Sequence, residues 1–132
     1  MSVSYRLDAN GVAELRLTNS QRRNALGFAT LQAIVDALET AHTGGARVVV
    51  LAAEGPVFSA GANFADLTGT SADIRFDDAM SAAVKAIGHS HIPVIATVQG
   101  PCLGAAVDLV LAVDVVVAAR SARFQIPAAK LG

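Results

Sequence analysis

Short apolar runs alternate in this chain with segments whose apolar residues recur at helical spacing. The runs RVVVLAA (47–53) and PVIATV (93–98) are rich in β-branched residues and have the length of strands buried on both faces. Two other segments have helical stripes, which are Leu31, Ile34, Val35 and Leu38, and then Phe76, Met80, Val84 and Ile87. This alternation predicts an α/β fold with parallel strand pairing.

The two ends of the chain extend the pattern. The stretch VSYRLDANGVAELRLT predicts two strands joined at Asn10-Gly11, a dipeptide typical of tight hairpins. Near the other end, the sequence predicts a helix over 103–112, a buried strand over 113–118 and a short strand over 123–126. No internal repeat or linker interrupts the 132 residues, which are enough for one domain, 1–132.

Composition and charge exclude several classes of protein. Hydrophobic residues make up 53% of the chain and charged residues 16%, which is far from a disordered composition. A formal net charge of −1 gives no basis for a nucleic-acid or anionic-membrane partner. The lone Cys102 excludes an internal disulfide framework, and no Cys/His cluster has metal spacing. With no secretion signal in MSVSYRLDANG, we expect a reducing, cytoplasmic location and no metal.

The apolar stretch 101–119 has to be tested as a membrane span. Its Val and Leu residues favour insertion by roughly 0.3–0.6 kcal/mol each, whereas Asp108 and Asp114 near its centre oppose it by roughly 2.5–3.5 kcal/mol each. The two acids outweigh the apolar residues. The sequence therefore predicts a buried helix followed by a buried strand, and no membrane span.

Two loops of small residues follow predicted strands and precede predicted helix starts. The first is GPVFSAGANF, and the second is GPCLGAAVDL. Small residues let a ligand approach the backbone, and a helix start leaves N–H groups without partners. The amide of Ala105 would be such a donor, with Asp108 one turn later on the same helical face. Taken alone, each loop has a more ordinary interpretation, which is a tight turn for the first loop and an acid capping or pairing near a helix start for the second. Together, two such loops after adjacent parallel strands predict an oxyanion hole.

The same segments resemble a known family. RRNALGFATLQAI is similar to the first CoA-binding segment of the crotonase (enoyl-CoA hydratase/isomerase) superfamily, and GPVFSAGANFADL to its first oxyanion loop. VQGPCLGAAVDLVLAVDVVVAARSARFQIPAAKLG resembles its second oxyanion loop, helix and following strands. The resemblance implies a crotonase-like (ClpP/crotonase) spiral of ββα units. It implies that 1–132 is the N-terminal core, truncated before the C-terminal helical part.

The resemblance also implies roles for individual residues. Ala62 and Ala105 would supply the two oxyanion N–H groups, and Asp108 falls where hydratases have their first catalytic glutamate. An acyl-CoA thioester would be the substrate, with no separate cofactor, as in enzymes of fatty acid metabolism. The residues expected to line the substrate and CoA groove are Arg23, Ala25, Leu26, Ala60, Gly61, Ala62, Asn63, Phe64, Ala65, Gly104 and Ala105.

Departures from the family pattern keep an alternative function open. Ala128 stands where hydratases have their second catalytic glutamate, so efficient hydratase activity by the two-glutamate route is in doubt. The chain would then be a non-catalytic or decayed acyl-CoA-binding paralogue. Family members are also about twice as long, so the resemblance implies a homo-oligomer (a trimer or hexamer) or a complementing chain. Hydration, isomerisation and decarboxylation share these loops, which therefore do not separate the reactions.

Other chemistries have weaker support in the sequence. Cys102 has no evident partner base, and a buried structural cysteine is the more ordinary interpretation. His42, His89 and His91 lie near predicted helix ends, where histidines are common. A dinucleotide-binding domain would need a G-x-G-x-x-G loop, which GPCLG does not provide.

Overall fold

The predicted α/β arrangement is confirmed by the computed structural model, which describes residues 2–63, 69 and 71–126, without the side chains of 71–73. Its main sheet has the strand order β1-β2-β3-β4-β6. The first two strands are antiparallel and meet at the predicted Asn10-Gly11 turn, whereas all other neighbours are parallel. The strands of this sheet are β1 (Val3–Leu7), β2 (Val12–Leu17), β3 (Val48–Ala53), β4 (Val94–Val98) and β6 (Val115–Ala118).

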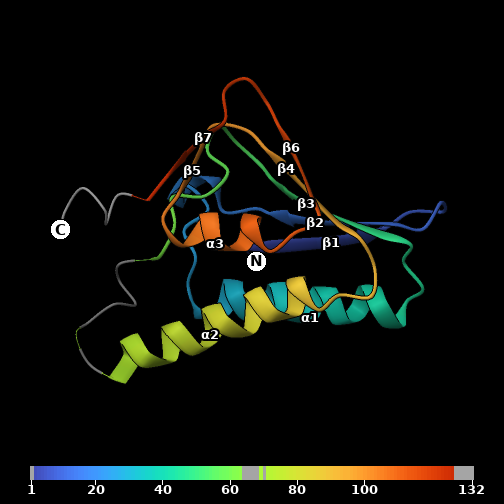
Figure 1. The fold of residues 1–132 in the computed structure, drawn as a ribbon, viewed down its shortest axis with the longest axis horizontal. Helices are drawn as coiled ribbons and strands as arrows, with labels where there is room; N and C mark the ends of the chain where they lie inside the picture. The colour runs from blue at the N-terminus through green and yellow to red at the C-terminus, as the bar shows by residue number, and fades with distance from the viewer. Residues whose placement is uncertain (1, 64–68, 70, 127–132) are drawn as a thin grey trace.

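Helices cover one side of this sheet. Figure 1 shows α1 (Phe28–Thr43) and α2 (Ser71–Gly88) side by side in one layer below the strands. The short helix α3 (Ala105–Leu111) contacts α2 and lies between it and the upper strands. A single 3₁₀ turn, η1 (Ser20–Arg22), connects β2 to the segment before α1. The two long helices coincide with the predicted stripes to within a few residues.

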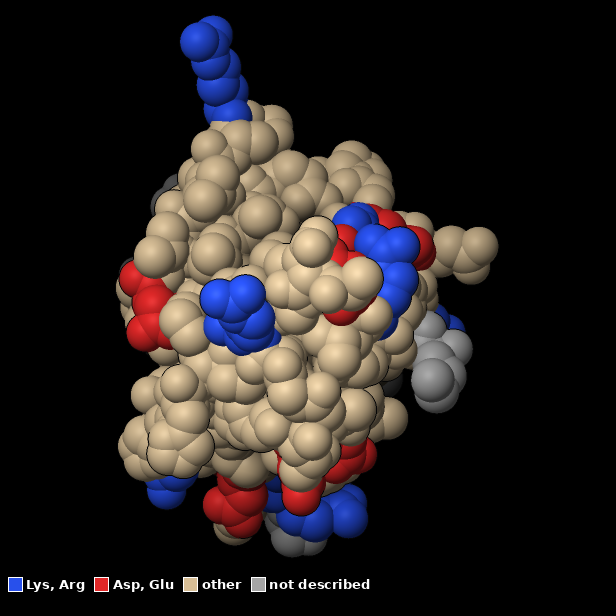
Figure 2. Space-filling view, turned by 90° about the vertical axis from the view of Figure 1, so that its right-hand side faces the viewer, with Lys and Arg blue, Asp and Glu red and all other residues tan. Residues whose placement is uncertain are grey.

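The core lies between the sheet and the helix layer. Alternate residues of β2 are buried, while Glu14 and Arg16 on its other face form an ion pair of 2.9 Å. Leu31, Ile34 and Leu38 of the predicted α1 stripe are buried on the core side, together with the buried residues of β2, as the helical spacing requires. On the face shown in Figure 2, charged side chains lie in small groups among uncharged residues, and some of these groups contain both acidic and basic side chains.

A second, two-stranded sheet was not anticipated. Pro101 and Cys102, expected as part of a turn, and Leu103, expected to open a helix over 103–112, form β5, so α3 begins only at Ala105. Strand β5 pairs in parallel with β7 (Arg123–Gln125), which matches the short strand predicted over 123–126. Neighbouring backbone bonds extend the pairing, since Gly104 N donates to Gln125 O at 2.8 Å and Arg123 N donates to Gly100 O at 2.9 Å. This small sheet holds the loop before α3 in place.

The prediction of a buried strand over 113–118 is wrong in its burial. Residues 115–118 do form β6, but all four are exposed, with Val117 at 56%. The physical reason is position, because β6 is the outer strand of the sheet, paired with β4 alone, and no described element covers its outer side. The apolar stretch 101–119 is divided between β5, α3 and β6. Among the described residues, no helix is long and apolar enough to span a membrane.

Candidate functional site

The first small-residue loop is held in shape by Ser59 and Gly61. Ser59 is fully buried; its hydroxyl donates to Asn24 O at 2.7 Å and accepts from Gly61 N at 3.1 Å. Gly61 has a φ of +92°, a conformation that favours glycine. A Cβ at Gly61 would lie 2.6 Å from Leu103 O and 3.5 Å from Ala105 N. The first loop therefore packs directly against the backbone that enters α3.

Backbone hydrogen bonds join this loop to two distant segments. Leu26 N donates to Gly61 O at 2.7 Å and Asn63 N donates to Leu26 O at 2.7 Å, which forms a bridge to the segment before α1. On its other side, Ser59 N donates to Pro101 O at 3.3 Å and Leu103 N donates to Ser59 O at 3.0 Å. Three parts of the chain that the sequence singled out separately are thus neighbours.

Two backbone amides at this junction have no acceptor among residues 2–63, 69 and 71–126. Within the described residues, neither Ala62 N nor Ala105 N donates a hydrogen bond. Ala105 is the first residue of α3, where a helix has unpaired N–H groups, and Gly104 before it has a φ of +56°. Ala62 directly follows Gly61, and a Cβ built on Gly61 would point toward Ala105 N. Both residues are half-buried, so a ligand can reach the junction.

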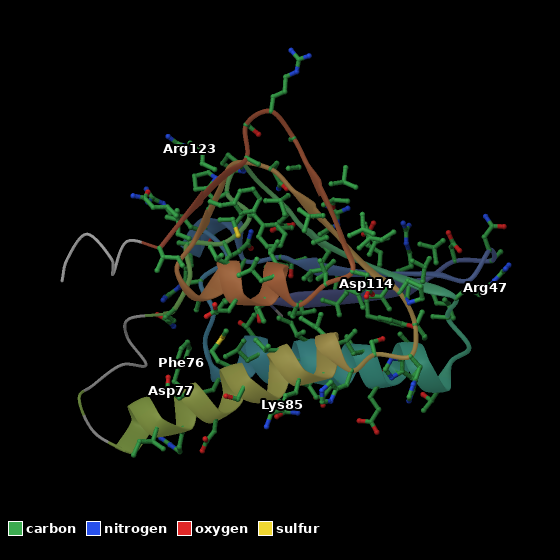
Figure 3. All side chains as sticks on the ribbon, viewed as in Figure 1. Arg47, Phe76, Asp77, Lys85, Asp114 and Arg123 are labelled. Atoms are coloured by element: carbon green, nitrogen blue, oxygen red, sulfur yellow. The ribbon has the colours of Figure 1, made fainter. Side chains whose placement is uncertain are left out.

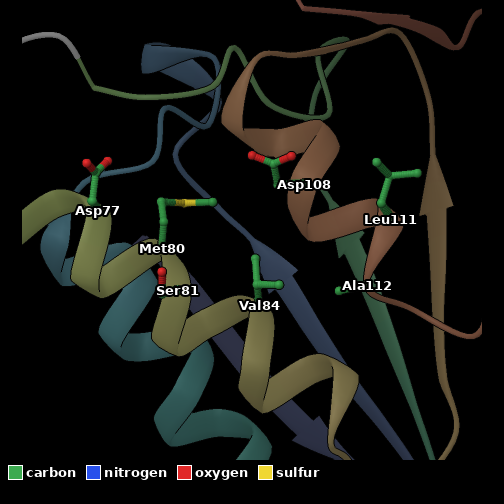
Figure 4. Close-up of a pocket in the computed structure, with 7 residues that line it drawn as sticks. All are labelled: Asp77, Met80, Ser81, Val84, Asp108, Leu111 and Ala112. Atoms are coloured by element: carbon green, nitrogen blue, oxygen red, sulfur yellow. The ribbon is translucent and has the colours of Figure 1, made fainter.

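Asp108 lies on the outer face of α3. The apolar residues around it, Ala106, Val107, Leu109 and Val110, are buried, whereas Asp108 and Leu111 are exposed. Asp108 is therefore not part of the core, although its neighbours in the sequence are. It lines a cavity of about 530 Å³ between α2 and α3, which Figure 4 shows. The carboxylate is one helical turn from the unpaired amide of Ala105.

A second cavity borders the first loop at Asn63. It has a volume of about 470 Å³, and its lining includes Arg22, Ala25, Phe28 and Asn63. Ala25 and Asn63 were expected in a CoA groove. Arg23 is exposed and has a φ of +54°; its carbonyl accepts from Ala60 N at 2.9 Å, so its backbone supports the loop. Phe64, Ala65 and Ala128 lie outside the described residues.

Sequence reasoning missed the residue that joins these segments, Asn24. It is buried with a φ of +53°, and its side-chain amide donates to Glu54 O and Val57 O at 3.0 Å each. Its Oδ1 accepts from Asn19 N at 2.9 Å. Asparagine tolerates left-handed backbone better than most residues. The signal in the sequence was the asparagine itself, a residue type that is enriched in left-handed backbone and in turns.

The cysteine and the histidines do not join the site. Cys102 is fully buried in β5, and burial raises the pKa of its thiol to about 11, so a thiolate nucleophile is disfavoured at neutral pH. His42 lies in the last turn of α1 with its Nε2 2.8 Å from Ser90 Oγ. The rings of His42 and His91 are 6.1 Å apart, near the C-terminal ends of α1 and α2.

Known proteins share both the sequence and this fold. The family model for enoyl-CoA hydratase/isomerase matches residues 8–132. The probable enoyl-CoA hydratase echA6 of Mycobacterium tuberculosis is 35% identical over 124 residues, which are 94% of this chain and 50% of that protein. The human enoyl-CoA hydratase domain-containing protein 3, mitochondrial, is 32% identical over 127 residues, which are 93% of this chain and 42% of that protein.

Solved structures agree with the sequence matches. The crystal structure of human enoyl Coenzyme A hydratase domain-containing protein 3 has a TM-score of 0.92 at 29% identity, covering 100% of this chain and 53% of that chain. An enoyl-CoA hydratase from Mycobacterium avium subsp. paratuberculosis has a TM-score of 0.87 at 30% identity, covering 100% and 50%. The chain spans about half the length of the curated relatives it matches. It has the crotonase fold and belongs to the enoyl-CoA hydratase/isomerase family.

Proposed function

We propose that this chain binds an acyl-CoA thioester and stabilises the enolate formed from it. The observation that supports this most strongly is the pair of unpaired amides, Ala62 and Ala105, brought together where Gly61 packs on the entry to α3. Two N–H donors from separate loops suit one thioester oxygen, which gains negative charge in the enolate. Removing a single donor of this kind costs about 3–4 kcal/mol of transition-state stabilisation.

Asp108 is the acid–base group in this proposal. With the thioester oxygen at the amide of Ala105, the α-carbon lies one bond from the carbonyl carbon and faces the next turn of α3, where Asp108 is. The carboxylate takes the α-proton and returns it. A positioned acid–base group contributes about 10²–10⁴-fold to a rate. The half-buried amides and the exposed carboxylate leave room for the substrate to enter.

The CoA portion would occupy the cavity that borders the first loop at Asn63. Arg22 lines it and is able to pair with phosphate groups, while the backbone around Ala25 and Asn63 supplies polar edges. The names of the relatives are consistent with a CoA thioester as ligand. An oligomer or a complementing chain stays a prediction. The cytoplasmic location is also a prediction, since one relative is named as mitochondrial.

The test is exchange of α-protons in a saturated acyl-CoA. The purified chain is incubated with butyryl-CoA in D₂O, and deuterium at the α-carbon is followed by mass spectrometry, with thioester binding measured by calorimetry. We expect Asp108→Asn to lower the exchange rate by about 10²–10⁴-fold and to leave thioester binding unchanged. Asp78→Asn is the matched control, because Asp78 is an exposed aspartate on α2 that does not line the cavity.

Two results would contradict the proposal. Exchange by Asp108→Asn at the rate of the unmodified chain would remove the role of Asp108. Thioester binding without any exchange by the unmodified chain would favour the alternative, a non-catalytic acyl-CoA-binding protein, which rests on Ala128 in place of the second glutamate.

A further inference from the structure

Gln99 holds the turn where β3 ends and the first small-residue loop begins. Its side-chain Nε2 donates to Ala53 O at 2.7 Å and to Gly55 O at 2.9 Å. These two bonds match the two N–H donors of a primary amide. The backbone carbonyl of Gln99 also accepts from Phe58 N at 3.1 Å. One residue therefore binds the segment 53–58 at both of its ends.

Gln99 stands at the start of the second small-residue loop. It directly follows β4, and the second loop begins at Gly100, which has a φ of +63°. A Cβ at Gly100 would overlap Pro56 O, so the backbones of the two loops touch beside Gln99. On its other side, Gly100 O accepts from Arg123 N at 2.9 Å, and Figure 3 shows Arg123 near the top of the molecule, beside the small sheet. The second loop is thus fixed at the point from which Gln99 reaches the first.

Beyond Gln99 the two loops run side by side toward the two unpaired amides. Ser59 and Cys102 form a parallel bridge between the loops. Ala62 lies three residues after Ser59, and Ala105 lies three residues after Cys102. Because both amides are equally far from the bridge along the chain, the register of the two loops sets the separation of the two N–H donors. Gln99 fixes that register where the pairing begins.

A second amide holds the same turn but does not link the two loops. Asn24 Nδ2 donates to Glu54 O and Val57 O at 3.0 Å each. Asn24 belongs to the segment before α1, so its bonds fix the shape of the turn and leave the register of the two loops undetermined. Gln99 belongs to one of these loops and holds the other, so it contributes to both.

We propose, resting on the proposed function, that Gln99 is a positioning residue that sets the separation of the amide donors of Ala62 and Ala105. In this role it does not contact the substrate and acts through the turn that it binds. Gln99 is half-buried, so water reaches the carbonyls of the turn once the amide is removed, and the first loop is then free to shift against the second. A displacement of about 1 Å costs about 10²-fold in rate when it misplaces a catalytic group.

The first test removes the amide and keeps an unbranched side chain of similar length. Exchange of the α-protons of butyryl-CoA in D₂O gives kcat and KM, and calorimetry gives thioester binding. We expect Gln99→Met to lower kcat by about 10–10²-fold, with KM and thioester binding within about threefold, because the two donors act mainly on the charge of the enolate. The matched control is Gln32→Met, since Gln32 is an exposed glutamine of α1 that bonds to Asp36 in the same helix; it should change neither quantity.

The second test titrates the donor within one folded protein. The carboxyl group introduced by Gln99→Glu has an O–H donor when it is protonated and none when it is ionised. Facing two carbonyl oxygens favours the protonated form. The exchange rate of Gln99→Glu, divided by that of the unmodified chain at the same pH, should therefore rise by roughly tenfold between about pH 8 and about pH 5. Taking this ratio removes the titration of Asp108, and Gln32→Glu should give a ratio that does not change with pH.

Each other outcome overturns a distinct claim. Exchange by Gln99→Met at the unmodified rate refutes the role of Gln99 and leaves the proposed function standing. A fall in kcat that is matched by the fall in thioester binding makes the amide merely structural, which also refutes the positioning role. If Gln99→Met does not fold, as judged by circular dichroism, an unchanging ratio for Gln99→Glu refutes the role instead. An unmodified chain without any exchange refutes the proposed function itself, and the role of Gln99 with it.

Discussion

Substituting Gly61 by alanine tests whether close packing of the two loops builds the site. Gly61 has a φ of +92°, and left-handed backbone costs an alanine about 1–2 kcal/mol. The new Cβ would also lie 2.6 Å from Leu103 O, which is backbone and has little freedom to move. Overpacking of this kind costs about 1–3 kcal/mol. Together, Gly61→Ala should lower the free energy of unfolding by about 2–5 kcal/mol, a large part of the stability of an ordinary domain.

Gly45→Ala is the matched control for the backbone part of this cost. Gly45 has a φ of +79°, but nothing lies within 4 Å of a Cβ built there. The effect of Gly→Ala on the unfolded chain is the same in both variants and cancels. In urea denaturation monitored by circular dichroism, Gly61→Ala should be less stable than Gly45→Ala by about 1–3 kcal/mol. It should also bind butyryl-CoA more weakly, because relief of the contact moves the segment that holds Ala105.

Equal stability of the two variants would show that the first loop does not press on Leu103 as the geometry states. Equal thioester binding, with the stability difference intact, would show that the amide of Ala105 is not part of the binding site. The two readouts therefore test the packing and its functional consequence separately.

Two further predictions concern buried groups beside the site. Ser59→Ala removes the acceptor of Gly61 N–H and the donor to Asn24 O, and each buried backbone group left unpaired costs about 1–3 kcal/mol of stability. Urea denaturation measures this loss. The control is Ser81→Ala, at an exposed serine, which should stay within about 0.5 kcal/mol of the unmodified chain. Cys102 should resist alkylation by iodoacetamide in native buffer and react quickly in urea, because it is fully buried and burial raises the pKa of its thiol from 9.0 to about 11. Because the thiol ionises at a lower pH in the unfolded chain than in the folded chain, the free energy of unfolding should fall as pH rises from 9 to 11. Fast alkylation of Cys102 in native buffer would contradict its burial.

Local patterns predicted the elements well because each pattern depends on near neighbours. The stripe through Leu31, Ile34 and Leu38 identifies α1 without reference to the rest of the chain, and Asn10-Gly11 identifies the hairpin for the same reason. The order of the loops along parallel strands also predicted that the two loops would lie close together, as Gly61 and the backbone entering α3 do. What it did not show is how the loops are held together, which depends on Asn24 and Ser59, two buried polar residues that each have a hydrogen-bond partner 30 or more residues away.

Burial of an apolar run was less predictable, because it depends on what covers the run. The strands Val94–Val98 and Val115–Ala118 have similar sequences and pair with each other, yet Ala96 is 0% exposed and its direct partner Val116 is 42% exposed. The position in the sheet explains the difference, since β4 lies between two strands and β6 lies at the edge.

The exposure of Asp108 also depends on what covers it. Its apolar neighbours indicate the inner face of α3, and the acid in their midst marks the outer face, which lines the cavity with Asp77. A charged residue within an apolar helix therefore reports which face is open, and here that face is where the proposed chemistry takes place.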